Sequence, residues 1–370
     1  MRALAGRLAL LAAPFALICG FVLHVLLASG ELERVDDVIE LQKTSARPVL
    51  FGAAYSDHTA YYKLHAVLSR RPTVIALGSS RVMAVRSALF RNEVAFYNAG
   101  SPLLHVGFFT EFLSRVPAGR EPRLIVVGLD HWLFSAGWPR SSPAMPELSQ
   151  GGPDPFKVLG NGLRKVVVDY LLGKYALADL ARVKGDTVLI GMNAVVNRHG
   201  YRNDGSHRIS APGPQKQIHD DMLRDIVAGM RIFAPAKTIS PESVEDLRRF
   251  LLLCQSKGIY VVGFLPAFTH RFYTALAGHD RYAYLRDLAP KLAPIFRDAG
   301  FAFFDFSDLA VVGASDAEAF DPVHISEKAY VRLFVEMARR DARLREVIAD
   351  VGDLSARLTA SRSDAYVFGE

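Results

Sequence analysis

The sequence predicts an α/β protein with a doubly wound, mainly parallel five-stranded sheet, a large insertion after the third strand and an N-terminal transmembrane helix. Short apolar runs typical of buried strands alternate with longer segments of helical pattern, as parallel sheets covered on both faces require. The alternation stops after the third strand, between about residues 135 and 237, and then resumes. The chain also opens on a long apolar segment without charged residues.

That apolar segment, residues 8–29, contains no Asp, Glu, Lys or Arg. At about 1.5 Å of rise per residue it is long enough to cross a hydrocarbon core of roughly 30 Å. Because Arg2 and Arg7 precede it and acidic residues follow it, we expect a single pass through the cytoplasmic (inner) membrane, with the N-terminus inside and the body in the periplasm. Secretory signals have apolar cores of about 7–15 residues, which favours an uncleaved anchor, although residues 28–30 are an acceptable cleavage site.

Composition argues against several classes of function. The formal net charge of +6 is spread along 370 residues without a dense basic block, so we expect no nucleic-acid partner. The two cysteines are Cys19, inside the apolar segment, and Cys254, in an expected helix. We therefore expect neither an intramolecular disulfide nor a metal site built on cysteine.

Five runs form the expected sheet, and the second of them has the weakest strand pattern. They are TVIALGSS (73–80), VAFYNAGS (94–101), RLIVVGLD (123–130), IYVVGFLP (259–266) and FAFFDFSD (301–308). Helical patterns lie at residues 103–114, 240–257, 282–299 and 326–340. Ser240 before Pro241 is a favourable helix start, because a serine hydroxyl caps the first turn and proline suits the first helical position.

The expected organisation has four parts. Residues 1–30 form the anchor, 31–70 a stalk and lead-in helix, 71–350 the α/β domain and 351–370 a C-terminal tail. The insertion at 135–237 begins with a loop rich in Pro, Ser and Gly and continues with an apolar helical patch at 156–183. We expect it to cover the C-terminal edge of the sheet, to lie next to the membrane, or to be an ordinary decorated loop, rather than to form a separate domain.

Candidate reactive groups lie at the carboxyl ends of the strands, where open parallel sheets place their sites. The first strand ends in Gly78, Ser79 and Ser80, and Asp321 and His324 precede the last helix. A serine nucleophile needs an imidazole to take its proton and a carboxylate to fix the imidazole tautomer. Because serines at a strand-to-helix junction are also common helix caps, the serine pair alone does not separate capping from catalysis.

In this order the motifs resemble the SGNH/GDSL hydrolase superfamily. The matching blocks are GSS after the first strand, NAG after the second, GLD after the third and D-x-x-H before the last helix. The resemblance implies a flavodoxin-like SGNH fold and a catalytic triad of Ser80, His324 and Asp321. It leaves Ser79 as a turn former or cap and assigns Gly100 to the oxyanion hole.

The single anchor and the GSS variant are similar to the membrane-anchored branch of cell-envelope O-acyltransferases. That branch includes the D-alanyl transfer protein of teichoic acid synthesis and the alginate O-acetylation proteins. The similarity implies an acyltransferase or esterase acting on O-acyl groups of a cell-envelope glycan or polymer through an acyl-Ser80 intermediate. It implies a membrane-bound O-acyltransferase as a partner, and no metal or organic cofactor. The alternative is a non-catalytic glycan-binding or scaffolding partner of such an acyltransferase.

Asp130 departs from the superfamily pattern, which usually has an asparagine in the third block. An ionised carboxylate only accepts hydrogen bonds and would repel an oxyanion. We therefore expect Asp130 to be protonated or to have a structural or substrate-binding role, so that the oxyanion hole relies on the N–H groups of Ser80 and Gly100. For substrate contact we select Arg81, Asn98, His131 and Trp132. The alternatives are an ion pair for the arginine, a turn role for the asparagine and aromatic packing for the other two.

Overall fold

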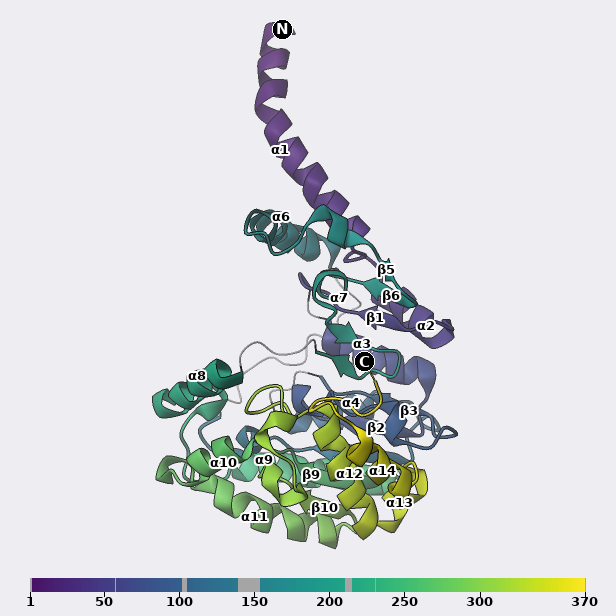
Figure 1. The fold of residues 1–370 in the computed structure, drawn as a ribbon, viewed down its shortest axis with the longest axis vertical. Helices are drawn as coiled ribbons and strands as arrows, with labels where there is room; N and C mark the ends of the chain where they lie inside the picture. The colour runs from purple at the N-terminus through teal and green to yellow at the C-terminus, as the bar shows by residue number, and fades with distance from the viewer. Residues whose placement is uncertain are drawn as a thin grey trace. The chain divides into compact units, whose positions relative to one another are not determined.

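Two compact units, each with its own five-stranded sheet, make up the chain (Figure 1). The computed structural model describes residues 2–56, 58–101, 105–138, 154–209, 215–229 and 231–369. The first unit comprises residues 1–65, 150–203 and 207–210, and the second comprises residues 66–149, 204–206 and 211–370.

The first unit is built on a mixed sheet of short strands in the order β5-β6-β1-β7-β8. The strands are β1 (Val49–Phe51), β5 (Val183–Lys184), β6 (Thr187–Ile190), β7 (Gly200–Tyr201) and β8 (His207–Arg208). The helices are α1 (Arg2–Ala28), α2 (Val35–Thr44), α6 (Pro155–Leu171) and α7 (Met192–Asn197). The central strand β1 pairs in parallel with β6 and antiparallel with β7, so it joins segments from distant parts of the chain.

Helix α1 is long and apolar enough over Leu11–Ala28 to cross a membrane, as the sequence predicts. Its last turns have a second role in the first unit. Val22, Val25 and Leu26 have no exposed surface and belong to the core of this unit, where α1 packs against α6. The folded body therefore begins inside the apolar helix rather than after it.

The boundaries of the expected domains differ from these units. The predicted stalk contains α2 and β1, and β1 is the central strand of a sheet. Residues 154–203 of the predicted insertion complete that sheet, so they belong to a separate compact unit, which the sequence did not lead us to expect. The sequence does not show this pairing, because strands of two to four residues carry no periodic signal. Most of the Pro-, Ser- and Gly-rich loop, residues 139–153, lies outside the described residues.

The second unit contains an all-parallel sheet in the order β3-β2-β4-β9-β10. Its strands are β2 (Val74–Leu77), β3 (Phe96–Asn98), β4 (Leu124–Gly128), β9 (Tyr260–Leu265) and β10 (Ala302–Asp305). Each lies within one of the five predicted runs, so the parallel α/β sheet is confirmed. Numbered along the chain, the order is 2-1-3-4-5, and the direction of winding reverses between β2 and β4. In doubly wound sheets this reversal is where ligand sites form.

Helices cover both faces of this sheet (Figure 1). The helices of this unit are α4 (Gly107–Ser114), α8 (Gln215–Ala228), α9 (Pro241–Ser256), α10 (His270–Ala277), α11 (Tyr284–Asp298), α12 (Glu327–Arg340), α13 (Ala342–Val347) and α14 (Val351–Ala360), while α3 (Thr59–Arg70) begins in the first unit. Phe303 of β10 packs on Phe296 of α11, and the next residue, Phe304, belongs to the core with α12. Because successive strand residues point to opposite faces, α11 and α12 lie on opposite sides of the sheet.

The predicted helix starts agree closely with the observed ones. Ser240 caps α9 by accepting a hydrogen bond from the Ser243 N–H at 3.2 Å, and Ser326 caps α12 in the same way through Ala329. The first residues of the helix expected at 103–114 lie outside the described residues, and α4 occupies the remainder.

Candidate active site

Ser80 lies on an exposed turn at the carboxyl end of β2. The chain leaves the strand at Gly78, and a short 3-10 helix, Ser80–Val82, follows. The Ser79 side chain is buried and its Oγ accepts a hydrogen bond from the Arg81 N–H at 3.1 Å. This confirms Ser79 as the cap of the turn and leaves the Ser80 hydroxyl as the exposed one.

Three glycines bring the ends of β2, β3 and β4 around the side chain of Val82. A Cβ added at Gly78, Gly100 or Gly128 would lie 2.6, 2.7 or 2.3 Å from a Val82 methyl carbon. Van der Waals contact begins well beyond those distances, so a side chain at any of the three positions would displace Val82. The glycines of the GSS, NAG and GLD motifs thus share one packing function, which is to hold the Ser80 turn against the sheet.

Ser80, His324 and Asp321 form a continuous hydrogen-bonded chain. Ser80 Oγ lies 2.9 Å from His324 Nε2, although the two residues are 244 positions apart in the sequence. His324 Nδ1 lies 2.7 Å from Asp321 Oδ2. This is the contact order of a serine nucleophile, its base and the carboxylate that orients the base.

The second oxygen of Asp321 holds the loop that carries the histidine. Asp321 Oδ1 accepts the backbone N–H groups of Val323 at 2.8 Å and His324 at 2.9 Å. Burial raises the pKa of Asp321, but these hydrogen bonds and the one from the His324 ring outweigh it, and the pKa stays below its ordinary value. The ionised carboxylate accepts from Nδ1–H, so Nε2 is left to accept the Ser80 proton.

Arg81 is buried and connects the Ser80 turn to the neighbouring loops. Its Nε donates to the Val323 carbonyl at 2.8 Å, directly before His324. Its Nη2 donates to the carbonyls of Pro266 at 2.9 Å and Ala267 at 2.5 Å, in the loop after β9. With only 2% of its surface exposed, Arg81 is not open to the substrate contact that the sequence suggested; its side chain connects the Ser80 turn to the His324 loop.

Asp130 is also fully buried, and its Oδ1 lies 3.7 Å from Arg81 Nη1. Burial raises the pKa of Asp130 to about 6, while Arg81, the nearby Ser79 hydroxyl and His324 oppose that rise. Among the described residues, no group makes a well-formed hydrogen bond to either carboxylate oxygen, so the effect of Ser79 is one of proximity. At neutral pH Asp130 is therefore mainly an anion with Arg81 as its counter-ion, and it lacks the amide donor of an asparagine.

The predicted oxyanion donor at Gly100 is occupied in this structure. Its N–H donates to the side-chain oxygen of Asn98 at 2.9 Å. The Asn98 amide donates in turn to the carbonyls of Val82 and Val85, each at 2.8 Å. Asn98 is fully buried, so it stabilises the backbone of the site and is not open to a substrate as expected.

His131 and Trp132 are likewise packed under the site rather than exposed to a ligand. His131 Nε2 lies 2.7 Å from Ser307 Oγ, and burial together with the Arg81 charge lowers the pKa of His131 well below its ordinary range. The Trp132 ring lies 5.4 Å from the Arg81 guanidinium. Both residues follow a buried strand. They contact the buried guanidinium of Arg81, in the place where we expected contacts with a substrate.

Two supporting residues are absent from the sequence-based set. Ser307 holds His131 and is itself held by Asp305 Oδ1, which accepts from the Ser307 N–H at 2.9 Å and from its hydroxyl at 2.5 Å. Tyr330 of α12 donates its hydroxyl to the Arg81 carbonyl. The sequence carries a signal for Ser307, since Asp305 and Ser307 lie at the end of the fifth predicted run, but their aromatic neighbours favour a core interpretation.

No protein-family model matches the chain, and no curated protein or solved structure matches it. Within the described ranges, no group of three or more His, Cys, Asp or Glu side chains is placed to hold a metal ion. The functional interpretation therefore depends on the sequence motifs and on the geometry at Ser80.

Proposed function

We propose that this protein is a serine acyltransferase or esterase of SGNH type, anchored in the cytoplasmic membrane with its body in the periplasm. The observation that carries the proposal is the chain from Ser80 Oγ to His324 Nε2 at 2.9 Å and from His324 Nδ1 to Asp321 at 2.7 Å. An exposed serine hydroxyl on an oriented imidazole is the arrangement that nucleophilic acyl transfer requires.

In the first half-reaction, His324 Nε2 takes the proton of Ser80 as Oγ attacks the carbonyl carbon of an ester or thioester. The tetrahedral intermediate collapses when the bond to the leaving group breaks, and His324 returns the proton to that group. Asp321 remains ionised and stabilises the imidazolium that forms in between. The product of this step is acyl-Ser80.

In the second half-reaction, a hydroxyl of the acceptor attacks acyl-Ser80 while His324 takes its proton. Release of Ser80 Oγ, which regains that proton from His324, completes the transfer. For the acceptor we propose a cell-envelope glycan or polymer, and for the acyl donor a membrane-bound O-acyltransferase partner. Water as the acceptor would make the same site an esterase.

The oxyanion hole limits the rate that this site can reach. The Ser80 N–H makes no hydrogen bond among the described residues and is available to an oxyanion, whereas the Gly100 N–H is held by Asn98. Asp130 supplies a negative charge where an amide donor would help. Since one lost donor costs about 2.7–4 kcal/mol of transition-state stabilisation, we expect a slow, specialised enzyme rather than a general lipase.

The same observation supports a second candidate function. With one proposed donor occupied and a buried anion below the site, the fold would also serve a non-catalytic glycan-binding or scaffolding partner of an acyltransferase. In cells, a Ser80→Ala, His324→Ala double variant distinguishes the two. Full complementation of a deletion strain supports the scaffold, and loss of envelope O-acylation supports the enzyme.

The direct test is covalent labelling by a serine-directed fluorophosphonate together with hydrolysis of a small acetyl ester. We expect Ser80→Ala to abolish labelling and to lower the rate at least about 10³-fold, because it removes the hydroxyl that lies 2.9 Å from His324 Nε2. Ser79→Ala is the matched control: it removes a cap at a cost of about 1 kcal/mol but leaves the nucleophile, so labelling persists. Unchanged labelling and hydrolysis in Ser80→Ala would refute the proposal.

A further inference from the structure

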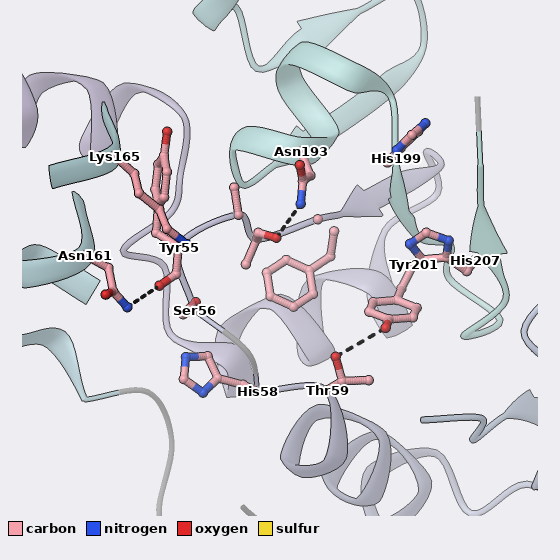
Figure 2. A pocket seen from close by; sticks show the side chains of 14 residues that line it. Tyr55, Ser56, His58, Thr59, Asn161, Lys165, Asn193, His199, Tyr201 and His207 are labelled. Atoms are coloured by element: carbon pink, nitrogen blue, oxygen red, sulfur yellow. Dashed lines mark hydrogen bonds between the residues drawn. The ribbon is translucent and has the colours of Figure 1, made fainter. Parts of the chain in front are cut away.

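The first unit contains a pocket of about 530 Å³, which none of the triad residues lines (Figure 2). It opens where the parallel strands β1 and β6 end, so residues 51–56 and Asn193 reach it from neighbouring strand ends. His199 and Tyr201 contribute from β7 and the chain before it, and α6 contributes Asn161 and Lys165. The volume lies within the roughly 300–1,000 Å³ of small-ligand sites.

A buried carboxylate fastens the wall of the pocket formed by residues 51–56. Glu31 Oε1 accepts the backbone N–H groups of Ala54 at 2.8 Å and Tyr55 at 2.7 Å, and its Oε2 accepts that of Met192 at 2.9 Å. Three N–H donors from two segments thus converge on one side chain that is 6% exposed. The wall is held by the fold and needs no ligand to order it.

Two asparagines hold the same wall from the opposite sides. Asn161 Nδ2 donates to the Tyr55 carbonyl at 3.1 Å, and Asn193 Nδ2 donates to the Ala53 carbonyl at 2.8 Å, as the dashed lines in Figure 2 show. Fixed donors and acceptors around a preformed cavity lower the ordering cost of binding.

The lining is cationic or neutral. None of the described residues that line the pocket is Asp or Glu. The lining does include one lysine and three histidines, which are Lys165, His58, His199 and His207. Lys165 is exposed on α6. Burial together with the charge of Arg208 lowers the pKa of His199, so that ring is a neutral hydrogen-bonding group. Glu31 is not a lining residue. Its carboxylate lies behind the wall and accepts three backbone N–H groups.

Hydroxyl groups and ring faces complete the lining. Thr59 Oγ1 lies 3.2 Å from the Tyr201 hydroxyl, and Ser56 lies nearby in the same wall (Figure 2). Phe51 also lines the pocket and adds an aromatic side chain. Groups that donate and accept, next to aromatic faces, match sugar rings, which have hydroxyls at their edges and C–H groups on their faces.

We propose that this pocket binds an anionic saccharide, a sugar unit that carries a carboxylate. Lys165 faces the carboxylate, while the asparagine, histidine and hydroxyl side chains bind the ring hydroxyls. The unit that contains the membrane-spanning helix would then be a carbohydrate-binding unit. This goes beyond the proposed function, since it requires no reaction at Ser80.

The test is calorimetric titration of the full-length, detergent-solubilised protein with a galacturonic acid trisaccharide and with the methyl ester of the same trisaccharide. We expect the acid to bind and the uncharged ester to bind at least tenfold more weakly. Lys165→Gln should weaken binding of the acid at least fivefold. Arg164→Gln, a neighbouring exposed cation on α6 outside the lining, should leave it unchanged.

Three results would overturn this proposal: no binding of either trisaccharide, equal affinity for acid and ester, or binding of inorganic phosphate without binding of the trisaccharide, which would indicate a simple anion site. The Ser80→Ala protein should bind the acid with wild-type affinity. A negative result in the labelling experiment and a negative result here are therefore independent.

Discussion

At the scale of single residues, the most informative group is Asp130, which is buried without a well-formed hydrogen bond and 3.7 Å from the Arg81 guanidinium. Its charge stabilises the internal arginine, and the arginine in turn holds the His324 loop through Val323. The carboxylate at position 130 is therefore explained by the arginine beside Ser80, which requires a counter-ion when it is buried.

Asp130 makes the second unit less stable as the pH rises. Its pKa is raised from 3.8 to about 6, so the folded protein binds the proton more tightly than the unfolded chain. The stabilising contribution is complete below about pH 4 and is lost as the pH rises through about 6. Between pH 5 and 7.5 we expect wild type to lose about 1–1.5 kcal/mol relative to Asp130→Asn, which does not titrate.

Urea unfolding followed by tryptophan fluorescence measures this difference. Both tryptophans, Trp132 and Trp138, belong to the second unit, so the signal reports on the unit that contains Asp130. Equal pH dependence in the wild type and in Asp130→Asn would contradict the expected result.

At the scale of elements, the site depends on how three strand ends and one helix start are joined. The glycines after β2, β3 and β4 pack on Val82, and the Arg81 side chain connects that turn to the loop after β9 and to the loop before α12. The Ser80 turn and the His324 loop are thus joined by one buried side chain that contacts backbone carbonyls.

Arg81→Lys keeps the positive charge beside Asp130 but loses the planar fork that reaches three carbonyls. We expect kcat for ester hydrolysis to fall at least about tenfold with KM nearly unchanged, because His324 is displaced from Ser80 while the substrate surface remains. We also expect a loss of stability of about 1–3 kcal/mol from carbonyls left without donors.

Arg86→Lys is the control for that change, since Arg86 lies on the same segment and pairs with Glu327 at 2.7 Å in a partly exposed position. A lysine can keep this ion pair, so activity should stay within twofold of wild type. If Arg81→Lys lowered stability but left kcat unchanged, the positioning role would be wrong.

At the scale of the whole molecule, α1 has two parts that differ in their exposure. Its N-terminal part exposes large apolar side chains such as Leu11, as a membrane-spanning segment does, whereas Val22, Val25 and Leu26 belong to the core of the first unit. Ser29 is fully buried and its carbonyl accepts the Gly191 N–H at 2.8 Å. Cleavage at residues 28–30 would remove part of this core, which favours an uncleaved anchor.

Substitutions along α1 should therefore differ in effect. Leu26→Ala deletes a fully buried side chain and should cost the first unit about 2–5 kcal/mol, whereas Leu11→Ala, 80% exposed on the same helix, should leave its stability unchanged. The measurement is the rate of tryptic cleavage within residues 154–203 of the solubilised protein. Similar rates in the two variants would show that α1 is not part of this core.

Local patterns in the sequence are enough to predict the parallel sheet of the second unit, the caps of its main helices, the apolar helix and Ser80, His324 and Asp321 as neighbours. These follow from local signals: apolar runs ending in small residues, serines before helical patterns, and the rule that polar groups gather at the carboxyl ends of parallel strands. Ser79 as the cap and Ser80 as the exposed hydroxyl also agree with the local pattern.

The division into two units and the buried contacts of Arg81, Asn98 and His131 become visible in the folded chain and not before. The pairing of Val49 with Val188 joins two strands that are too short to show an alternation of apolar and polar residues. No local pattern in the sequence therefore predicts it. Whether a polar side chain faces solvent or a buried carbonyl depends on backbone brought from elsewhere in the chain, as Val323 is brought to Arg81 across 242 residues. Those partners come together only when the chain folds, because a buried polar group bonds to whichever groups are near it in three dimensions, and these can be distant in the sequence.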